Sequence, residues 1–402
     1  MRALGQRATS TTTAASERRS TPRSTAARRR VVPRVGDERN DDASSSHIVA
    51  LATLSTALRR VDDARRANDG ARGGWIDIAG ARVRLPRGAR PWACAHFVGG
   101  AALGAFPDVA YDGLLTRCAD ETGVAIIATA YDVDLNHEKI AKACGEMYAR
   151  ARAEVCEREG LDARTTPTFR FGHSLGCKLV TILACEDAAR GRSGGIGGVA
   201  GDGTIDMDWD EASGTAVAAR PSASGSGDVA VAGHFMVAFN NADAADSVKL
   251  IEKFARELLK KRTGESGGVG ADFFSSLPSL SAFAERAVKA AGLEFVPTPK
   301  ETLERARTRF VSRRTRLIKF KNDDLDQNRE LMEALETRFK VYPGRVDARE
   351  LDFGNHLTPV YFSLDGLKLS PALEKLVGQF SLGDEEGVKR LADEFSAFIR
   401  EK

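Results

Sequence analysis

The sequence lacks the features that mark several common classes of protein. No run of about 18 or more apolar residues occurs, so a membrane-spanning helix is not predicted and any membrane contact would be peripheral. The six cysteines form no CxxC pair, so neither a metal site nor a disulfide framework is expected. No GxGxxG follows the first predicted strand, which argues against a dinucleotide-binding oxidoreductase, and no cofactor is expected.

Acidic residues are nearly missing from the first 36 residues, which hold nine arginines against the single acid Glu17. This segment carries a charge of +8, and subtracting it from the total of +3 leaves about −5 on the rest of the chain. The remaining part is therefore mildly acidic and lacks the positive field that nucleic-acid binding requires. We expect no nucleic-acid partner.

The same segment is rich in serine, threonine and alanine and has no apolar stretch, a composition typical of organelle transit peptides. We therefore expect residues 1–46 to be disordered and to be removed on import. A disordered basic tail is the alternative interpretation of this composition.

From Gly74 onward, strand and helix signals alternate in a way that predicts an α/β fold with a mostly parallel central sheet flanked by helices. Strands are expected at 75–85 (as a hairpin), 91–98, 123–130, 168–171, 229–241, 315–323 and 346–353, and helices at 110–121, 137–159, 172–190, from 298, at 325–339 and from 384. One domain is predicted over 74–402, with a disordered glycine- and serine-rich insertion at 191–227 and a helical lid at 243–292.

The strongest local motif is a GxSxG formed by Gly172, Ser174 and Gly176, which lies between a predicted strand and a predicted helix. In a nucleophile elbow the chain turns so sharply that only small residues fit two positions before and after the serine. Two further matches centre on Ser193 and Ser266, but both lie in predicted loops. We therefore predict that Ser174 is the nucleophile, with a helix cap or a plain turn as the alternative.

A serine at an elbow needs an acid and a base, which follow it in the order serine, acid, histidine. His356, directly after the last predicted strand, is the predicted base, with a surface loop residue as the alternative. Three aspartates follow the strand residues RLIKF. Asp324 is the first choice for the acid and Asp323 the second, because Asp326 lies at the expected helix start, where an acid also serves as a cap. The alternative is that all three aspartates only stabilise the turn and cap the helix that follows it.

Backbone N–H groups are expected to stabilise the oxyanion that develops on an acyl substrate. Leu175, the residue after the nucleophile, supplies the first N–H, and Phe97 or Val98 supplies the second from the loop HFVGGAALGAFP. His96 in this loop is expected to hold it by hydrogen bonds.

Together these residues resemble an uncharacterised α/β-hydrolase-like family of plants, algae and cyanobacteria, catalogued as a domain of unknown function. The resemblance rests on ordered blocks between residues 90 and 360: HFVGGAALGAFP, ATAYDVDLNHEKIA, FGHSLGCKL, VAFNN, LEFVPTPKETLERA, IKFKNDDLDQN and GNHLTP. It implies an α/β-hydrolase fold, with Ser174 at the elbow, Asp323 and Asp324 at the acid position and His356 at the base position. It implies no known substrate, and the insertion at 191–227 departs from the compact family pattern.

In plant and algal members the resemblance also implies plastid targeting, so a chloroplast location is expected. The first function considered is a serine hydrolase acting on an ester, with a lipid or pigment ester of the plastid as a candidate substrate. Acyl transfer to another acceptor would use the same groups. The second is a non-catalytic member of the fold that binds a partner or ligand in the chloroplast. The presence of all three residue types in the right order favours the enzyme.

The transit segment generates a first prediction. The mature protein isolated from its organelle should begin near residue 47, because the preceding segment has no apolar face to bury. Sequencing of the amino terminus checks this. An intact Met1 on the mature protein would contradict it.

Overall fold

The structure is a computed structural model that describes residues 59–63, 74–101, 103–189, 207–210, 215–218, 231–244, 246–247, 292, 294–361 and 383–401. The predicted transit segment 1–46 lies outside these residues, as do Ser193, Ser266 and most of the predicted lid at 243–292.

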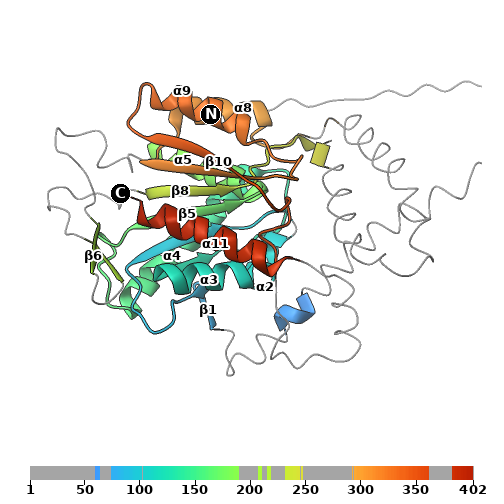
Figure 1. Ribbon diagram of the computed structural model, residues 1–402. Helices are drawn as coiled ribbons and strands as arrows, with labels where there is room; N and C mark the ends of the chain where they lie inside the picture. The colour runs from blue at the N-terminus through green and yellow to red at the C-terminus, as the bar shows by residue number, and fades with distance from the viewer. Residues whose placement is uncertain are drawn as a thin grey trace, which may run out of the picture. The chain divides into compact units, whose positions relative to one another are not determined.

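Eight strands form one sheet in the order β1-β2-β4-β3-β5-β8-β9-β10 (Figure 1). Their bounds are β1 Trp75–Ile78, β2 Ala81–Arg84, β3 Ala93–Val98, β4 Val124–Ala128, β5 Thr168–His173, β8 Val231–Val237, β9 Arg314–Phe320 and β10 Arg345–Leu351. β2 pairs antiparallel with both β1 and β4, and the other neighbours in this sheet pair in parallel. The mostly parallel sheet and the amino-terminal hairpin expected from the sequence are confirmed.

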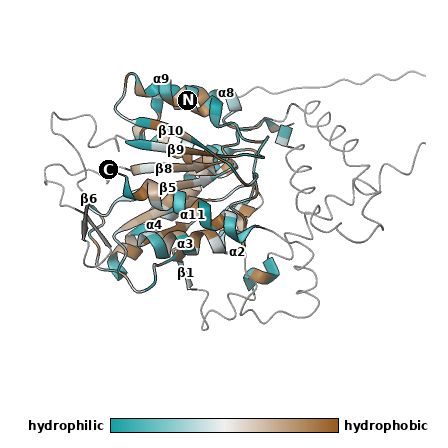
Figure 2. Ribbon diagram, in the orientation of Figure 1, coloured by the Kyte–Doolittle hydropathy of each residue, from teal (hydrophilic) through white to brown (hydrophobic). Residues whose placement is uncertain are grey.

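Helices cover both faces of the sheet, so β3, β4 and β5 are buried along their whole length. One face packs against α3 (Asp112–Thr122) and α11 (Glu385–Arg400). The other packs against α4 (His137–Arg158), α5 (Leu175–Ala189), α8 (Pro299–Arg309) and α9 (Asn328–Phe339). Two short elements, η2 (Leu103–Ala105) and α2 (Pro107–Ala110), follow β3. In Figure 2, α11 carries both brown and teal segments, as expected for a helix with one buried face.

An aromatic cluster fixes α11 beneath the central strands. Alternate strand residues point to the same face, and Phe97, Phe171 and Phe235 all belong to the cluster on the α11 side. The rings of Phe171 and Phe235 lie 5.1 and 5.4 Å from the ring of Phe395 in α11. Helix α11 is therefore anchored to β5, which leads into the GxSxG turn, and to its neighbouring strand β8.

Side-chain caps set the starts of two helices that border the site. The Asn136 side chain accepts a hydrogen bond from the Lys139 N–H (2.8 Å) where α4 begins. Thr298 and Glu301 form a reciprocal capping box at α8, with Pro299 in the first turn. Both starts lie within one residue of the positions predicted from the sequence.

The insertion at 191–227 differs from its prediction. The described residues within it form β6 (Met207–Asp210) and β7 (Thr215–Ala218), which pair as a separate antiparallel two-stranded sheet. The expectation of no regular structure is therefore wrong for these residues. In β6, Met207 and Trp209 alternate with Asp208 and Asp210, and such an apolar–polar alternation favours a strand. Among the helices that the structure describes, none is both long and apolar enough to cross a membrane.

The separateness of the β6–β7 sheet generates a second prediction. Deleting residues 193–227 should leave the eight-stranded domain folded, with a change in unfolding free energy of about 1 kcal/mol or less, because long loops add little closure cost. Thermal and denaturant unfolding of the full chain and the deletion variant measure this. A loss of several kcal/mol would mean that the insertion packs on the domain.

Candidate active site

Ser174 occupies a sharp turn between β5 and α5. β5 ends at His173 and α5 begins at Leu175, so Ser174 alone connects them. Its φ of +55° lies in the left-handed region that residues other than glycine rarely adopt. The Ser174 N–H donates to the carbonyl oxygen of Val237 (3.0 Å), and the Ser174 carbonyl accepts from the Cys177 N–H (3.0 Å). The strained backbone is therefore held by both β8 and α5, as is common at catalytic positions.

The two glycines of the motif are required by close contacts at this turn. A Cβ on Gly176 would lie 2.0 Å from the carbonyl oxygen of Val98, at the end of β3. A Cβ on Gly172 would lie 2.8 Å from the Cα of Cys177 in α5. A side chain on Gly176 would therefore collide with the neighbouring strand β3, whereas one on Gly172 would collide with the helix that follows the serine.

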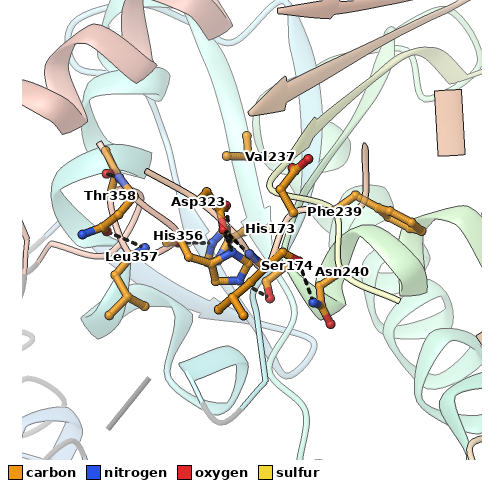
Figure 3. Close-up of polar contacts among 12 residues, drawn as sticks. His173, Ser174, Val237, Phe239, Asn240, Asp323, His356, Leu357 and Thr358 are labelled. Atoms are coloured by element: carbon orange, nitrogen blue, oxygen red, sulfur yellow. Dashed lines mark hydrogen bonds and ion pairs between the residues drawn. The ribbon is translucent and has the colours of Figure 1, made fainter. Parts of the chain in front are cut away.

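Three side chains from three strand ends meet beside this turn (Figure 3). His356 Nε2 lies 2.8 Å from Ser174 Oγ, and His356 Nδ1 lies 2.9 and 3.1 Å from the two carboxylate oxygens of Asp323. An ionised carboxylate only accepts hydrogen bonds, so His356 carries its proton on Nδ1 and its Nε2 accepts from the Ser174 hydroxyl. This is the geometry of a hydroxyl nucleophile beside an oriented base.

The aspartate that contacts His356 is Asp323, not Asp324. Asp323 is buried, whereas Asp324 is exposed, so the first choice made from the sequence is wrong and the second is the one in contact. The physical reason is a tight turn after β9, in which the Asp323 N–H donates to the carbonyl oxygen of Phe320 (3.2 Å). This turn brings Asp323 rather than its neighbour against the histidine.

The third aspartate of the cluster, Asp326, serves the start of α9 as expected, because its carboxylate accepts from the Asn328 N–H (3.0 Å). Burial, with a smaller contribution from the nearby charge of Asp323, raises the pKa of Asp326 to about 7. Asp326 therefore lies close to the three-residue cluster without joining it.

The segments that carry Asp323 and His356 are joined to each other. β9 and β10 are parallel neighbours, so their carboxyl ends lie at the same edge of the sheet. Beyond the strands, the Lys321 and Asn322 N–H groups donate to the carbonyl oxygens of Phe353 and Gly354 (both 3.2 Å). Asp323 and His356 follow these paired segments directly, which explains why residues 33 positions apart meet.

Of the oxyanion donors predicted from the sequence, the structure is consistent with Leu175 but not with Phe97 or Val98. Leu175 is the first residue of α5, so its N–H has no acceptor within the helix. Phe97 and Val98, however, lie inside β3 in register with β5, where their N–H groups belong to the sheet ladder. That expectation is wrong because β3 extends to Val98. The backbone beside the serine is that of Gly100, whose added Cβ would lie 3.1 Å from the Cβ of Ser174.

A chain of hydrogen bonds that was not predicted from the sequence joins the loop that contains Gly100 to His356. The Gly100 N–H donates to the Tyr111 hydroxyl (2.8 Å), which lies 2.9 Å from His173 Nδ1. His173 Nε2 lies 2.9 Å from the carbonyl oxygen of His356. Since a carbonyl only accepts, His173 carries its proton on Nε2, and the Tyr111 hydroxyl donates to Nδ1.

The protonation states required by this chain are consistent with burial. Burial lowers the pKa of His173, and the nearby His356 lowers it further, to about 3. His173 therefore stays neutral. Burial also raises the pKa of Tyr111, which keeps its hydroxyl a donor. Tyr111 and His173 therefore connect the Gly100 loop to the His356 loop. His173 belongs to the motif itself, whereas Tyr111 follows α2 and carries no motif that could have revealed its role.

His96 has a structural position, though not the one expected. It lies within β3, stacks on Tyr148 with a ring separation of 4.4 Å, and its Nε2 lies 2.9 Å from the Thr129 hydroxyl. It thus contacts α4 and the residue after β4 instead of holding the glycine loop.

Within the part of the chain that the structure describes, no group of three or more histidine, cysteine or acidic side chains is arranged to hold a metal ion.

The strand order, with β2 antiparallel in a parallel sheet, and the serine elbow after the central strand β5 define the α/β-hydrolase fold. The model of a family described as "Protein of unknown function (DUF1350)" matches residues 74–196 and 225–373, and the chain belongs to this family. The break between the two matched segments falls within the insertion.

Solved structures with a similar arrangement include esterases. A hyperthermophilic esterase from the archaeon Pyrobaculum calidifontis is 14% identical, with 90% of this chain and 92% of that one covered and a TM-score of 0.40. Carboxyl esterase 2 from the fungus Tuber melanosporum is 14% identical, with 81% and 88% covered and a TM-score of 0.41. Esterase B from Lactobacillus rhamnosis is 12% identical, with 88% and 97% covered and a TM-score of 0.40. No curated protein matches the chain.

The chain of hydrogen bonds through Tyr111 generates a third prediction. Tyr111→Phe should slow the reaction of Ser174 with a fluorophosphonate at least tenfold, because the Gly100 N–H and His173 Nδ1 both lose their partner. Tyr148→Phe is the matched control, since Tyr148 is also buried and its hydroxyl donates to the Thr168 hydroxyl far from the elbow along the strands. Each variant should lose about 1–3 kcal/mol of stability. Equal labelling rates for the two variants would show that Tyr111 has no role in positioning the site.

Proposed function

We propose that the protein is a serine hydrolase that cleaves an ester through an acyl-enzyme intermediate. The observation that carries this proposal is the contact of His356 with both Ser174 Oγ (2.8 Å) and the Asp323 carboxylate (2.9 Å). All three side chains are at least nine-tenths buried, so their mutual hydrogen bonds are weakly screened by water. The catalytic roles follow from chemistry that each group is able to perform in this arrangement.

In the first step Ser174 Oγ attacks the ester carbonyl carbon while His356 Nε2 takes the hydroxyl proton. Asp323 keeps the His356 proton on Nδ1 and stabilises the ring when it becomes charged. The Leu175 N–H and an N–H of the loop after Val98 stabilise the oxyanion. The C–O bond to the alcohol then breaks, and His356 returns the proton to the leaving alkoxide oxygen.

In the second step a water molecule replaces the alcohol. His356 Nε2 removes a proton from the water as its oxygen attacks the acyl carbon, and the proton returns to Ser174 Oγ as the acid leaves. An alcohol or amine acceptor in place of water would give acyl transfer with the same residues. We propose hydrolysis of a small-molecule or lipid ester in the plastid, in line with the composition of residues 1–46.

A fluorophosphonate probe tests the proposal and separates it from a non-catalytic binding function. The mature protein should be labelled, Ser174→Ala should not, and Asp323→Asn should slow labelling about 10³- to 10⁴-fold because His356 would adopt the wrong tautomer. Asp324→Asn is the matched control, since it makes the same change at the exposed neighbour, and should stay within about twofold of the wild type.

An unlabelled wild-type protein would contradict the hydrolase and leave the binding function in its place. Slowing of the same size in Asp323→Asn and Asp324→Asn would contradict the role given to Asp323.

A further inference from the structure

A buried lysine lies one helical turn after the elbow. Lys178 is in the first turns of α5 and its side chain is fully buried. Among the described residues its ammonium nitrogen has no hydrogen-bond partner, and it lies 5.4 Å from the ring centroid of Phe295. The proposed mechanism does not use this group. A methionine would fill the same apolar space, so packing alone gives no reason for an amine here.

His137 lies against the same aromatic ring. It is the first residue of α4, is 1% exposed, and stacks on Phe295 with a ring separation of 4.2 Å. Neither ring nitrogen has a hydrogen-bond partner within the described ranges. Burial and the charge of Lys178 lower the pKa of His137 to about 3, so its ring is neutral and offers one N–H donor.

The carboxylate of Glu301 attracts Lys178 but forms no hydrogen bond with it, because it is bound elsewhere. Glu301 attracts the lysine, but its side chain is committed to the capping box of α8, where it accepts from the Thr298 N–H (2.9 Å). Desolvation lowers the pKa of Lys178 to about 7, so near neutral pH the group is divided between its charged and neutral forms. Buried polar groups are normally hydrogen-bonded, so two neighbouring donors that have no partner among the described residues are available to bind a ligand.

Lys178 belongs to the same helix as Leu175, the proposed oxyanion donor. Lys178 lies three residues after Leu175, so both are on the same side of α5, about one turn or roughly 5 Å apart along its axis. Beside Phe295 and His137, the Val296 N–H donates to the Leu135 carbonyl oxygen (2.9 Å) and the Glu138 N–H to the Val296 carbonyl oxygen (3.0 Å). Leu135 and Val296 are 40% and 48% exposed, so apolar side chains lie at the surface of this segment.

We propose that Lys178 and His137 bind a carboxylate of the substrate, so that the substrate is an ester carrying a second, ionised acid group. This inference rests on the proposed function. The carboxylate accepts from the Lys178 ammonium and from one His137 ring N–H, with Phe295 turning aside to admit it. The spacing of one helical turn between Leu175 and Lys178 favours the half-ester of a short dicarboxylic acid, whose ester carbonyl would face Ser174.

Paired esters test the specificity. The 4-nitrophenyl half-ester of glutaric acid should be cleaved with a higher kcat/KM than 4-nitrophenyl butyrate, and Lys178→Met should lower kcat/KM at least tenfold for the half-ester alone. His137→Leu, which removes the second donor, should do the same to a smaller extent. Lys139→Met is the matched control, because it removes one positive charge from an exposed position of α4 and should change neither ester more than twofold.

Binding of glutarate to the Ser174→Ala protein, measured by calorimetry, separates this inference from the hydrolase itself. Affinity should fall at least tenfold on adding Lys178→Met. In the parent protein it should also weaken as the pH rises above about 7, since only charged Lys178 binds the anion; Glu301 stays ionised and His137 neutral over that range.

The outcomes are distinguishable. If both esters lose activity equally in Lys178→Met, or if glutarate binding does not depend on Lys178, the carboxylate site is wrong while the hydrolase stands. If Ser174 never reacts but glutarate binding depends on Lys178, the hydrolase is wrong while the site stands.

Discussion

The close approach of Gly176 to the end of β3 is the constraint on which the rest of the site depends. Because Gly176 has no side chain, the first turn of α5 lies against the carbonyl oxygen of Val98, and Ser174 is forced into a left-handed conformation between strand and helix. That position directs the serine hydroxyl toward the ends of β9 and β10. Without this contact, the helix would retreat from the sheet and the hydroxyl would no longer face His356.

His356 is held from two sides. Asp323 fixes the His356 ring through Nδ1, while His173 fixes the backbone through the His356 carbonyl oxygen. Through Tyr111 the same chain of hydrogen bonds reaches the Gly100 loop, next to the serine. Ser174, His356 and the loop proposed to bind the oxyanion are thus parts of one buried network, in which a change at one member is expected to affect the others.

Much of this architecture was predictable from the sequence, because local patterns determine it. Strand and helix periodicity predicted the sheet and its helices, and the spacing of Gly172, Ser174 and Gly176 predicted the turn. Chain order predicted His356.

The choice between Asp323 and Asp324 was not predictable, because it depends on the turn after β9 and on the pairing of Lys321 with Phe353. Phe97 and Val98 were misjudged because sheet register, and not composition, sets where β3 ends. Contacts between distant elements, such as Tyr111 with His173 and Lys178 with Phe295, leave no local pattern at all.

We propose that Ser174, activated by His356, is the residue that becomes acylated. The most direct measurement is mass spectrometry of peptides from protein mixed with 4-nitrophenyl acetate and quenched in acid within one turnover. The account predicts an added acetyl group on the peptide that contains Ser174, and none on the peptides that contain the other two GxSxG serines, Ser193 and Ser266. Acetylation confined to any other residue, or no acetylated peptide at all, would contradict it.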